Sequence, residues 1–234
     1  MRRTLARERE LSPNIMHLVV QPQKLEPRWP IVLMAALVYA STQLPGRVQV
    51  FPRWGLLLLM ASLIVPLVGV HVAPRKQRWL QIEKVALAIF LAAAGFGIIF
   101  DLKDLFVAML RPPNGLTGIQ LLNSSIALWS SNVLTFSVAY WWIDRGGAES
   151  RALGESNAPD WRFPREDVDD PTLAPWQPTY VDYLFLAFCT ATSFGPTEAM
   201  PMTHRAKILM MAESSISLIT VLAIASRAIG LLGS

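Results

Sequence analysis

The chain has 234 residues, of which 53% are hydrophobic and 16% are charged, and its formal net charge is +4. A soluble domain usually has about a quarter of its residues charged, whereas the apolar residues here come in long blocks. This composition indicates an integral membrane protein. The basic residues lie in clusters beside the apolar blocks, so the positive charge concerns orientation in a membrane more than nucleic-acid binding.

A transmembrane helix needs about 20 predominantly apolar residues to cross a hydrocarbon core of roughly 30 Å. Several segments of the chain reach or approach that length. In chain order, the expected spans are Trp29 to Leu44, Trp54 to Ala73, Lys84 to Phe100, Leu116 to Ile143 and Ala206 to Leu232. The sequence therefore predicts an all-α fold, a polytopic transmembrane helical bundle.

The N-terminal residues carry alternating charges without an apolar core directly behind the arginines, so they do not resemble a cleavable signal peptide. We expect a cytoplasmic N-terminal segment over 1–28, three transmembrane helices over 29–115 and a C-terminal module over 116–234. Basic residues precede the first span, and the sequence PRKQRW follows the second. By the positive-inside rule, this multi-pass protein of the cell inner membrane has its N-terminus in the cytoplasm.

The fourth expected span ends in YWWIDRGG. We expect its aromatic residues to form a belt at the membrane surface and its glycine pair to end the helix. The belt residues are Tyr140, Trp141 and Trp142.

A polar loop over 144–178 follows, with too many prolines for a long helix. Its aromatic residues favour a loop that folds back on the membrane face. These are Trp161, Phe163 and Trp176. An acidic vestibule that attracts cations is the alternative for this loop.

The segment Tyr180 to Gly195 is apolar but short for a span, and it contains Asp182. If it crosses the bilayer, the chain has six spans, and PTEAMPMT is a short outer turn. If it enters and leaves on one side, the chain has five spans plus a re-entrant pore-type helix. The amphipathic stretch Asp101 to Leu110 is a further segment that could dip into the membrane and change the count.

The segment Thr190 to Pro201, with the sequence TATSFGPTEAMP, resembles the pore-loop frame of potassium channels. In that family a short pore helix ends in Thr-x-Thr-x-Val-Gly-Tyr-Gly-Asp, and a proline soon precedes the inner helix. The order of elements is also similar, with the polar loop 144–178, a pore-type helix and turn over 179–203 and a last helix over 204–232. The chain further resembles an uncharacterised bacterial family of polytopic membrane proteins with channel-like C-terminal halves.

The resemblance to the pore-loop frame implies a cation channel or channel-like membrane pore, built as a homo-oligomer and as a tetramer if four copies surround an axis, whereas the uncharacterised family implies no activity. The pore- or filter-like residues that it indicates are Thr190, Thr192, Ser193, Gly195, Thr197 and Glu198. Pro196 and Thr197 replace the Tyr-Gly pair of the family, and neither residue type suits a ladder of backbone carbonyls. We therefore expect a degenerate filter, not of the potassium type, in which side chains coordinate monovalent or divalent cations. The alternative is a six-helix membrane transporter or assembly protein of unknown substrate.

Polar residues inside the expected spans are the other candidate sites. In the last helix, Glu213, Ser217 and Thr220 share one face, which should point into the bundle because a charged group in lipid is unfavourable. Asn123 lies on a polar stripe of the fourth span, so we expect these two helices to pack together. The structural interpretations are an internal pairing of Glu213 with a basic group and hydrogen bonds across helices for the hydroxyls.

The sequence contains no catalytic constellation, so we predict neither an enzyme nor a cofactor. We expect no metal site either, because Cys189 is the single cysteine and the histidines are scattered. Asp182, Glu198 and His204 lie near the turn and could bind a cation or relay a proton, although such residues are usually solvated. The expected partners are the lipid bilayer, cations and further copies of the chain, and not nucleic acid.

Overall fold

A computed structural model describes residues 30–32, 36, 76–110, 118–147, 150–151, 157–167, 176–193 and 199–232. The segment 1–28 and the second expected span lie outside the described residues, as does nearly all of the first. The structure therefore bears on the third expected span and on the C-terminal module.

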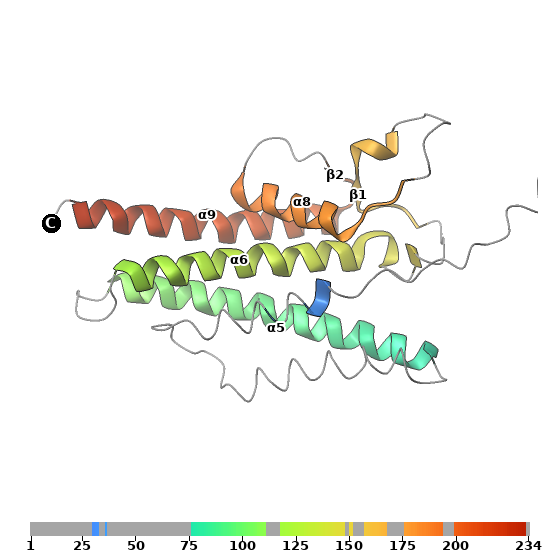
Figure 1. Cartoon of the computed structure of the whole chain (residues 1–234), viewed down its shortest axis with the longest axis horizontal. Coiled ribbons are helices and arrows are strands. Elements are labelled where there is room, and N and C mark those ends of the chain that lie inside the picture. Colours follow the sequence, from blue (N-terminus) through green and yellow to red (C-terminus); the bar gives the residue numbers. More distant parts are fainter. Residues whose placement is uncertain are drawn as a thin grey trace, which may run out of the picture.

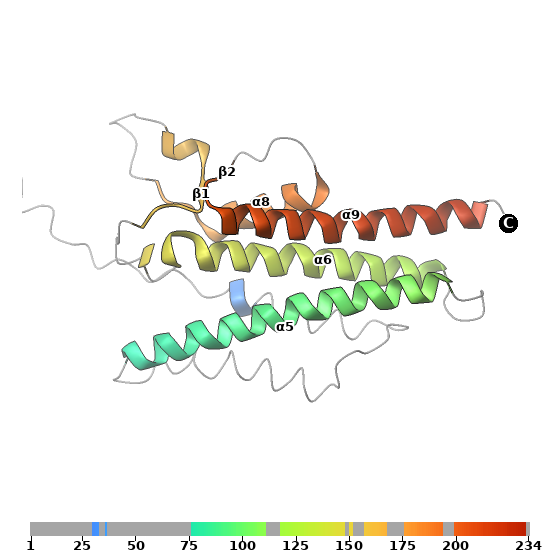
Figure 2. The ribbon, with the colours of Figure 1, turned by 180° about the vertical axis from the view of Figure 1, so that it is seen from behind.

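Four α-helices, three long and one short, make up most of the described chain. They are α5 (Lys76–Leu110), α6 (Gly118–Ile143), α8 (Tyr180–Thr192) and α9 (His204–Leu232). Figure 1 shows α6 between α5 on one side and α9 with α8 on the other, and the same order appears from behind in Figure 2. α6 runs antiparallel to α5 and to α9. Both α5 and α9 therefore begin at the end of the bundle where α6 ends.

Short elements lie at that end. They are the 3₁₀ helices η1 (Asp144–Gly146) and η2 (Pro164–Asp167) and the strands β1 (Trp161–Arg162) and β2 (Met200–Pro201). The two strands pair antiparallel, with Arg162 opposite Met200. We call this region the loop end of the bundle.

Two of the described helices are long and apolar enough to cross a membrane, over Gln81–Val107 in α5 and His204–Ala225 in α9. In each helix, 22% of the most apolar stretch is buried within the chain. Large apolar side chains therefore face outward from both helices. They include Ile82, Val85, Ile89, Phe96, Ile208, Met211, Leu218 and Leu222. An outward apolar surface of this kind is suited to lipid, and it differs from the mostly buried core helix of a soluble protein.

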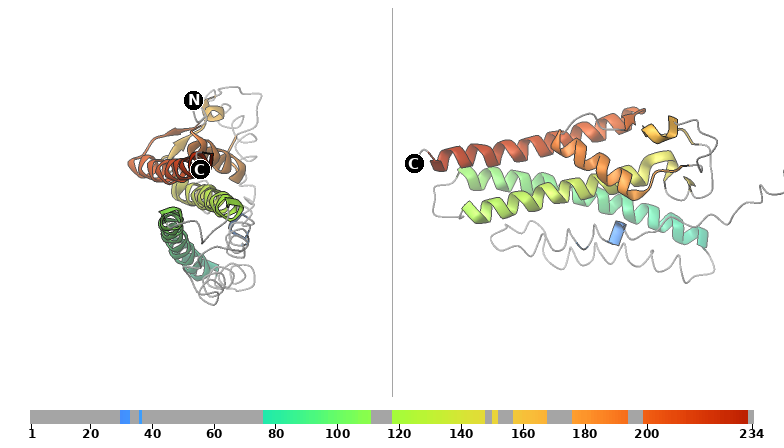
Figure 3. Two further views of the ribbon diagram at one scale, coloured as in Figure 1. Left: turned by 90° about the vertical axis from the view of Figure 1, so that its left-hand side faces the viewer. Right: turned by 45° about the horizontal axis from the view of Figure 1, so that its top comes forward.

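α6 differs from these two helices because it lies in the middle of the bundle and carries several buried polar side chains. These are Ser125, Ser131, Asn132, Thr135 and Ser137. The Ser137 hydroxyl, for example, lies 2.8 Å from the Tyr180 hydroxyl of α8. A helix surrounded by other helices can carry such groups since its neighbours supply hydrogen-bond partners. The left view in Figure 3 looks along the bundle and shows α6 in this central position.

α5 is longer than the predicted third span and has 35 residues. The stretch Asp101 to Leu110, which the sequence indicated as a separate amphipathic segment, continues the helix. It contains neither glycine nor proline, and its leucine, lysine and alanine residues favour helix. The pattern of charges thus marks a change of surface along one helix and does not mark a new element.

α8 is too short to cross a membrane. Its 13 residues span roughly 20 Å at about 1.5 Å per residue, against a hydrocarbon core of about 30 Å. It begins at the loop end, and β2, which follows it in the chain, lies at the loop end again (Figure 1).

The last turn of α8 lies beside the middle of α9. The Ser214 hydroxyl donates to the Thr190 carbonyl at 3.2 Å, and the Ser217 hydroxyl donates to the Ala191 carbonyl at 2.5 Å. Residue 217 is roughly 20 Å along α9 from its first residue. The segment 180–201 therefore enters and leaves the bundle at one end, which we call its re-entrant course, and six full spans are not supported.

The predicted glycine pair does end α6. Gly146 and Gly147 have φ of 79° and 97°, and the Gly147 amide donates to the Asp144 carbonyl at 2.9 Å. A Cβ on Gly147 would lie 2.8 Å from the Trp142 carbonyl oxygen. Only glycine fits this turn, which sends the chain from α6 into the loop.

We expect Gly147→Ala to lower the free energy of unfolding by about 1–3 kcal/mol, because its φ of 97° and ψ of 173° suit glycine alone. Thermal stability of the purified protein in mild detergent checks this. Gly97→Ala in α5 is the matched control, since a Cβ there meets nothing within 4 Å and alanine favours helix. Equal thermal midpoints for the two variants would contradict the role given to Gly147.

Candidate functional site

Asp144, the first residue after α6, organises the loop end. Its carboxylate is fully buried. It accepts a hydrogen bond from the Tyr183 hydroxyl of α8 at 2.6 Å and another from the Asp160 backbone amide at 2.8 Å. The Arg145 guanidinium lies 3.5 Å from it. One carboxylate thus joins the end of α6, the start of α8 and the polar loop.

Asp160 has a similar role for the start of α9. Its carboxylate is fully buried. It accepts hydrogen bonds from two nitrogens of the Arg205 guanidinium, Nε at 2.6 Å and Nη2 at 2.5 Å. It also accepts from the Thr203 hydroxyl at 2.5 Å. Bidentate pairs of this type fix geometry as well as adding energy. The loop is therefore attached to the chain on both sides of the re-entrant segment.

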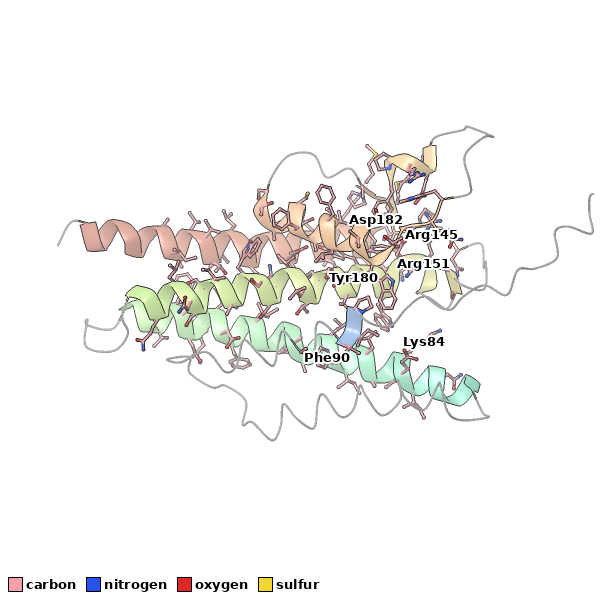
Figure 4. The ribbon with its side chains drawn as sticks, in the orientation of Figure 1. Lys84, Phe90, Arg145, Arg151, Tyr180 and Asp182 are labelled. Carbon is pink, nitrogen blue, oxygen red and sulfur yellow. The ribbon has the colours of Figure 1, made fainter. Side chains whose placement is uncertain are left out.

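Arg151 closes the end of α6. Its side chain is buried, and Nη1 donates to the carbonyls of Trp141 at 2.8 Å and Asp144 at 2.7 Å. A guanidinium at a helix C-terminus satisfies free carbonyls and complements the negative end of the helix dipole. Figure 4 shows Arg145, Arg151, Tyr180 and Asp182 together at the loop end.

These contacts decide between the two interpretations of the polar loop, for the part of it that the structure describes. Asp144, Asp160 and Glu166 all pair with arginines or backbone amides and do not form an open acidic vestibule. Trp161 and Phe163 are buried against the helices, so the described part of the loop folds back on the bundle, and its place at a membrane face stays a prediction.

The predicted aromatic belt at the end of α6 is wrong in part. Tyr140 and Trp141 are buried, with 0% and 3% exposure, because α8 and the loop cover this end of α6. Aromatic residues at the end of a span therefore mark a buried contact here.

The titratable residues near the turn do not form a common site among the described residues. The Asp182 carboxylate accepts from the Thr179 amide and hydroxyl, both at 2.7 Å, and so caps the N-terminus of α8. His204 is exposed at the start of α9, and Glu198 lies outside the described residues. The capping box explains why an acidic residue stands at the start of this apolar helix.

A second cluster of polar groups surrounds the inner end of α8. Glu213 of α9 is fully buried, and the Tyr140 hydroxyl of α6 donates to its Oε2. The Asn132 side-chain amide donates to the Glu213 backbone carbonyl at 3.2 Å. Glu213 Oε1 and Asn132 Oδ1 have no hydrogen-bond partner among the described residues. The expected pairing of Glu213 with a basic group is therefore wrong for the described part of the chain.

Hydroxyl groups line the same region. The Thr190 hydroxyl donates to the Leu186 carbonyl at 2.8 Å and also meets the Tyr140 hydroxyl. The expected hydrogen bonds across helices are found for Ser217, whereas the Thr220 hydroxyl donates within α9 to the Ile216 carbonyl at 2.8 Å. The cluster thus combines a carboxyl, hydroxyls and helix carbonyls.

The pore- or filter-like residues divide into two groups. Thr190, Thr192 and Ser193 form the inner end of α8, where Ser193 has a φ of 52° and the Thr192 hydroxyl donates to its own helix. The others, Gly195, Thr197 and Glu198, lie outside the described residues. Asn123 is exposed near the start of α6 and does not join the Glu213 cluster.

Tyr140 and Asn132 were not predicted as partners of Glu213. They lie eight residues apart, which places both on one face of α6. That spacing was visible in the sequence, and the predicted packing of this helix against the last one is confirmed, but the sequence did not indicate which residues of α6 would meet Glu213.

No protein-family model, curated protein or solved structure matches this chain. The functional interpretation therefore depends on the geometry of the two clusters.

We expect Asp160→Asn to lower the free energy of unfolding by about 1–3 kcal/mol, because the Arg205 guanidinium loses its charged partner. Asp104→Asn is the matched control, since its carboxylate lies 3.9 Å from Lys103 in a more exposed pair. Such pairs contribute about 0–1 kcal/mol. Chemical denaturation in detergent compares the two, and an equal loss in both variants would refute the importance of Asp160.

Proposed function

We propose that this protein is a channel-like membrane protein that passes cations, with the inner end of α8 lining the path. The observation that carries the proposal is the course of segment 180–201. It starts at the loop end, reaches the middle of α9 and returns to β2 at the loop end. Re-entrant backbone at membrane depth is tolerated where it is buried in protein or lines a water-filled path.

The charges at the inner end of α8 favour a cation. A helix C-terminus carries roughly half a negative charge, and this one ends beside Glu213 and several hydroxyls. Within the described ranges, no basic side chain forms an ion pair with Glu213. A cation is therefore stabilised at this depth and an anion is repelled.

A single re-entrant segment per chain does not enclose a path, so the proposal requires a homo-oligomer. The outer faces of α8 and α9 offer apolar surface for lipid and for neighbouring copies. Exposed side chains there include Val181, Phe185, Phe188, Met211 and Leu218. A tetramer follows from the resemblance to pore-loop channels, in which four copies surround one axis.

The distribution of basic residues orients the bundle. The loop end collects the start of α5, whose first residues are KQR, and the basic residues of the loop and of the start of α9. The loop and α9 contribute Arg145, Arg151, Arg162, Arg165, Arg205 and Lys207. The positive-inside rule then places the loop end in the cytoplasm of a multi-pass inner-membrane protein. The re-entrant segment opens on the cytoplasmic side, whereas the pore loops of potassium channels open outward.

A membrane transporter is the second candidate. The observation in its favour is that Glu213 is enclosed by α6, α8 and α9 of one chain. A carrier needs no second copy to complete such a site, so the oligomeric state separates the two candidates.

We expect single cysteines that replace Ala158 and Met200 to react from the same side of the membrane, on a Cys189→Ser background. Both positions are exposed at the loop end. A membrane-impermeant maleimide should reach them only after the cells are permeabilised. Asn114→Cys, between α5 and α6 at the opposite end, is the control and should react in intact cells. Reaction of positions 158 and 200 from opposite sides would disprove the re-entrant course.

We expect the purified protein in liposomes to release trapped alkali cations but not chloride. Glu198→Gln, in the segment after α8, should reduce that release, while Asp104→Asn on α5 should not change it. Mass measurement in nanodiscs should find an oligomer. A strictly monomeric protein, or equal cation release with and without protein, rejects the channel.

A further inference from the structure

Glu213 has the contacts of a binding site that is incomplete. Its carboxyl is fully buried, Tyr140 donates to Oε2, and Oε1 has no partner among the described residues. A buried carboxylate without a paired positive charge is strongly unfavourable, most of all inside a membrane. Neutralising the group requires a cation that arrives from outside the chain.

The described elements packed against α9 do not supply that cation. From α6, the titratable group that faces Glu213 is Tyr140, which is neutral when it donates. From α8, the Thr190 side chain meets the Tyr140 hydroxyl. α5 meets α9 further along, where Leu105 and Ala223 belong to one apolar cluster. None of the described side chains in these contacts is basic.

A second unpartnered oxygen lies in the same contact between α6 and α9. Asn132 is fully buried, and its amide nitrogen donates to the Glu213 carbonyl, while its Oδ1 has no partner among the described residues. Carboxylate and amide oxygens are hard ligands for metal cations, but two of them fall short of the six or more oxygens that surround Ca²⁺ or Mg²⁺, which favours a monovalent cation or a proton. Both free oxygens therefore offer acceptors, and neither offers a donor.

We propose that Glu213 is an intramembrane binding site for a monovalent cation, taken up on its Oε1. The ligand is a proton or an alkali-metal ion, and Tyr140 positions the carboxyl by holding Oε2. Glu213 directly precedes Ser214, whose hydroxyl holds the inner end of α8. The inference depends on the proposed cation path for the route by which the ligand arrives.

Dicyclohexylcarbodiimide tests the site, because it is apolar and reacts with carboxylic acids inside membranes. The acid adds across one C=N bond, with its proton going to nitrogen and its oxygen to carbon. The O-acylisourea then rearranges to a stable N-acylurea, and the protein gains the whole mass of the reagent. Mass spectrometry of the full-length protein in liposomes measures the adduct, and peptide mapping locates it.

We expect the adduct on Glu213 and its loss in Glu213→Gln, whose amide oxygen can still accept from Tyr140. Glu83→Gln is the matched control, because Glu83 is another largely buried carboxyl of a candidate span. The Glu83→Gln variant should keep the adduct on Glu213. Peptide mapping of the unchanged protein needs no variant, so a variant that fails to fold does not prevent the test.

The arms of the experiment separate the two ligands. An alkali-metal ion as ligand predicts that sodium or potassium chloride slows labelling, whereas choline chloride does not. A proton as ligand predicts labelling that falls as pH rises and ignores the salt. No adduct on Glu213, or an adduct that depends on neither pH nor salt, overturns the inference. Labelling requires no ion flux, so a protein that labels but passes no cations contradicts the proposed function alone.

Discussion

A helix that ends inside an apolar bundle leaves backbone carbonyls where no bulk water can reach them, and these groups must find donors within the protein. At the inner end of α8, Ser214 and Ser217 of α9 supply two such donors. Their spacing of three residues presents both hydroxyls on neighbouring positions of one helix face. The depth of α8 in the bundle, the position of Glu213 beside it and the polarity of the proposed path all depend on this contact.

The outer end of α8 is held by charges. Asp144 and Asp160 are both fully buried and tie the polar loop to α8 and α9. A buried charge is tolerated when it is paired and its other hydrogen bonds are satisfied, and both carboxylates meet that condition. The two ends of the re-entrant segment are thus fixed by different chemistry, hydroxyls of α9 at the inner end of α8 and ion pairs at the loop end. The cation path follows from this arrangement as a proposal.

Much of this arrangement could be predicted from particular residues. The apolar lengths of α5 and α9, the glycine pair after α6 and the inward position of Glu213 follow from composition and periodicity. The course of α8 could not be predicted, because a short apolar segment fits both a tilted span and a re-entrant helix. The partners of Glu213 also depend on which faces of α6 and α9 meet, and one sequence does not contain that information. The prediction that Tyr140 belongs to an aromatic belt at the membrane surface was wrong for the same reason.

The most direct test of the re-entrant course is disulfide formation between Arg162→Cys and Met200→Cys on a Cys189→Ser background. These positions face each other in the β1–β2 pair, where the Cα separation of roughly 4.5–5.5 Å suits a disulfide. We predict rapid cross-linking in membranes by a mild oxidant. The control pair is Arg162→Cys with Ser193→Cys, of which Ser193 lies at the inner end of α8. This pair should not cross-link. If α8 crossed the bilayer, positions 162 and 200 would lie on opposite faces, and the absence of their disulfide would contradict the account.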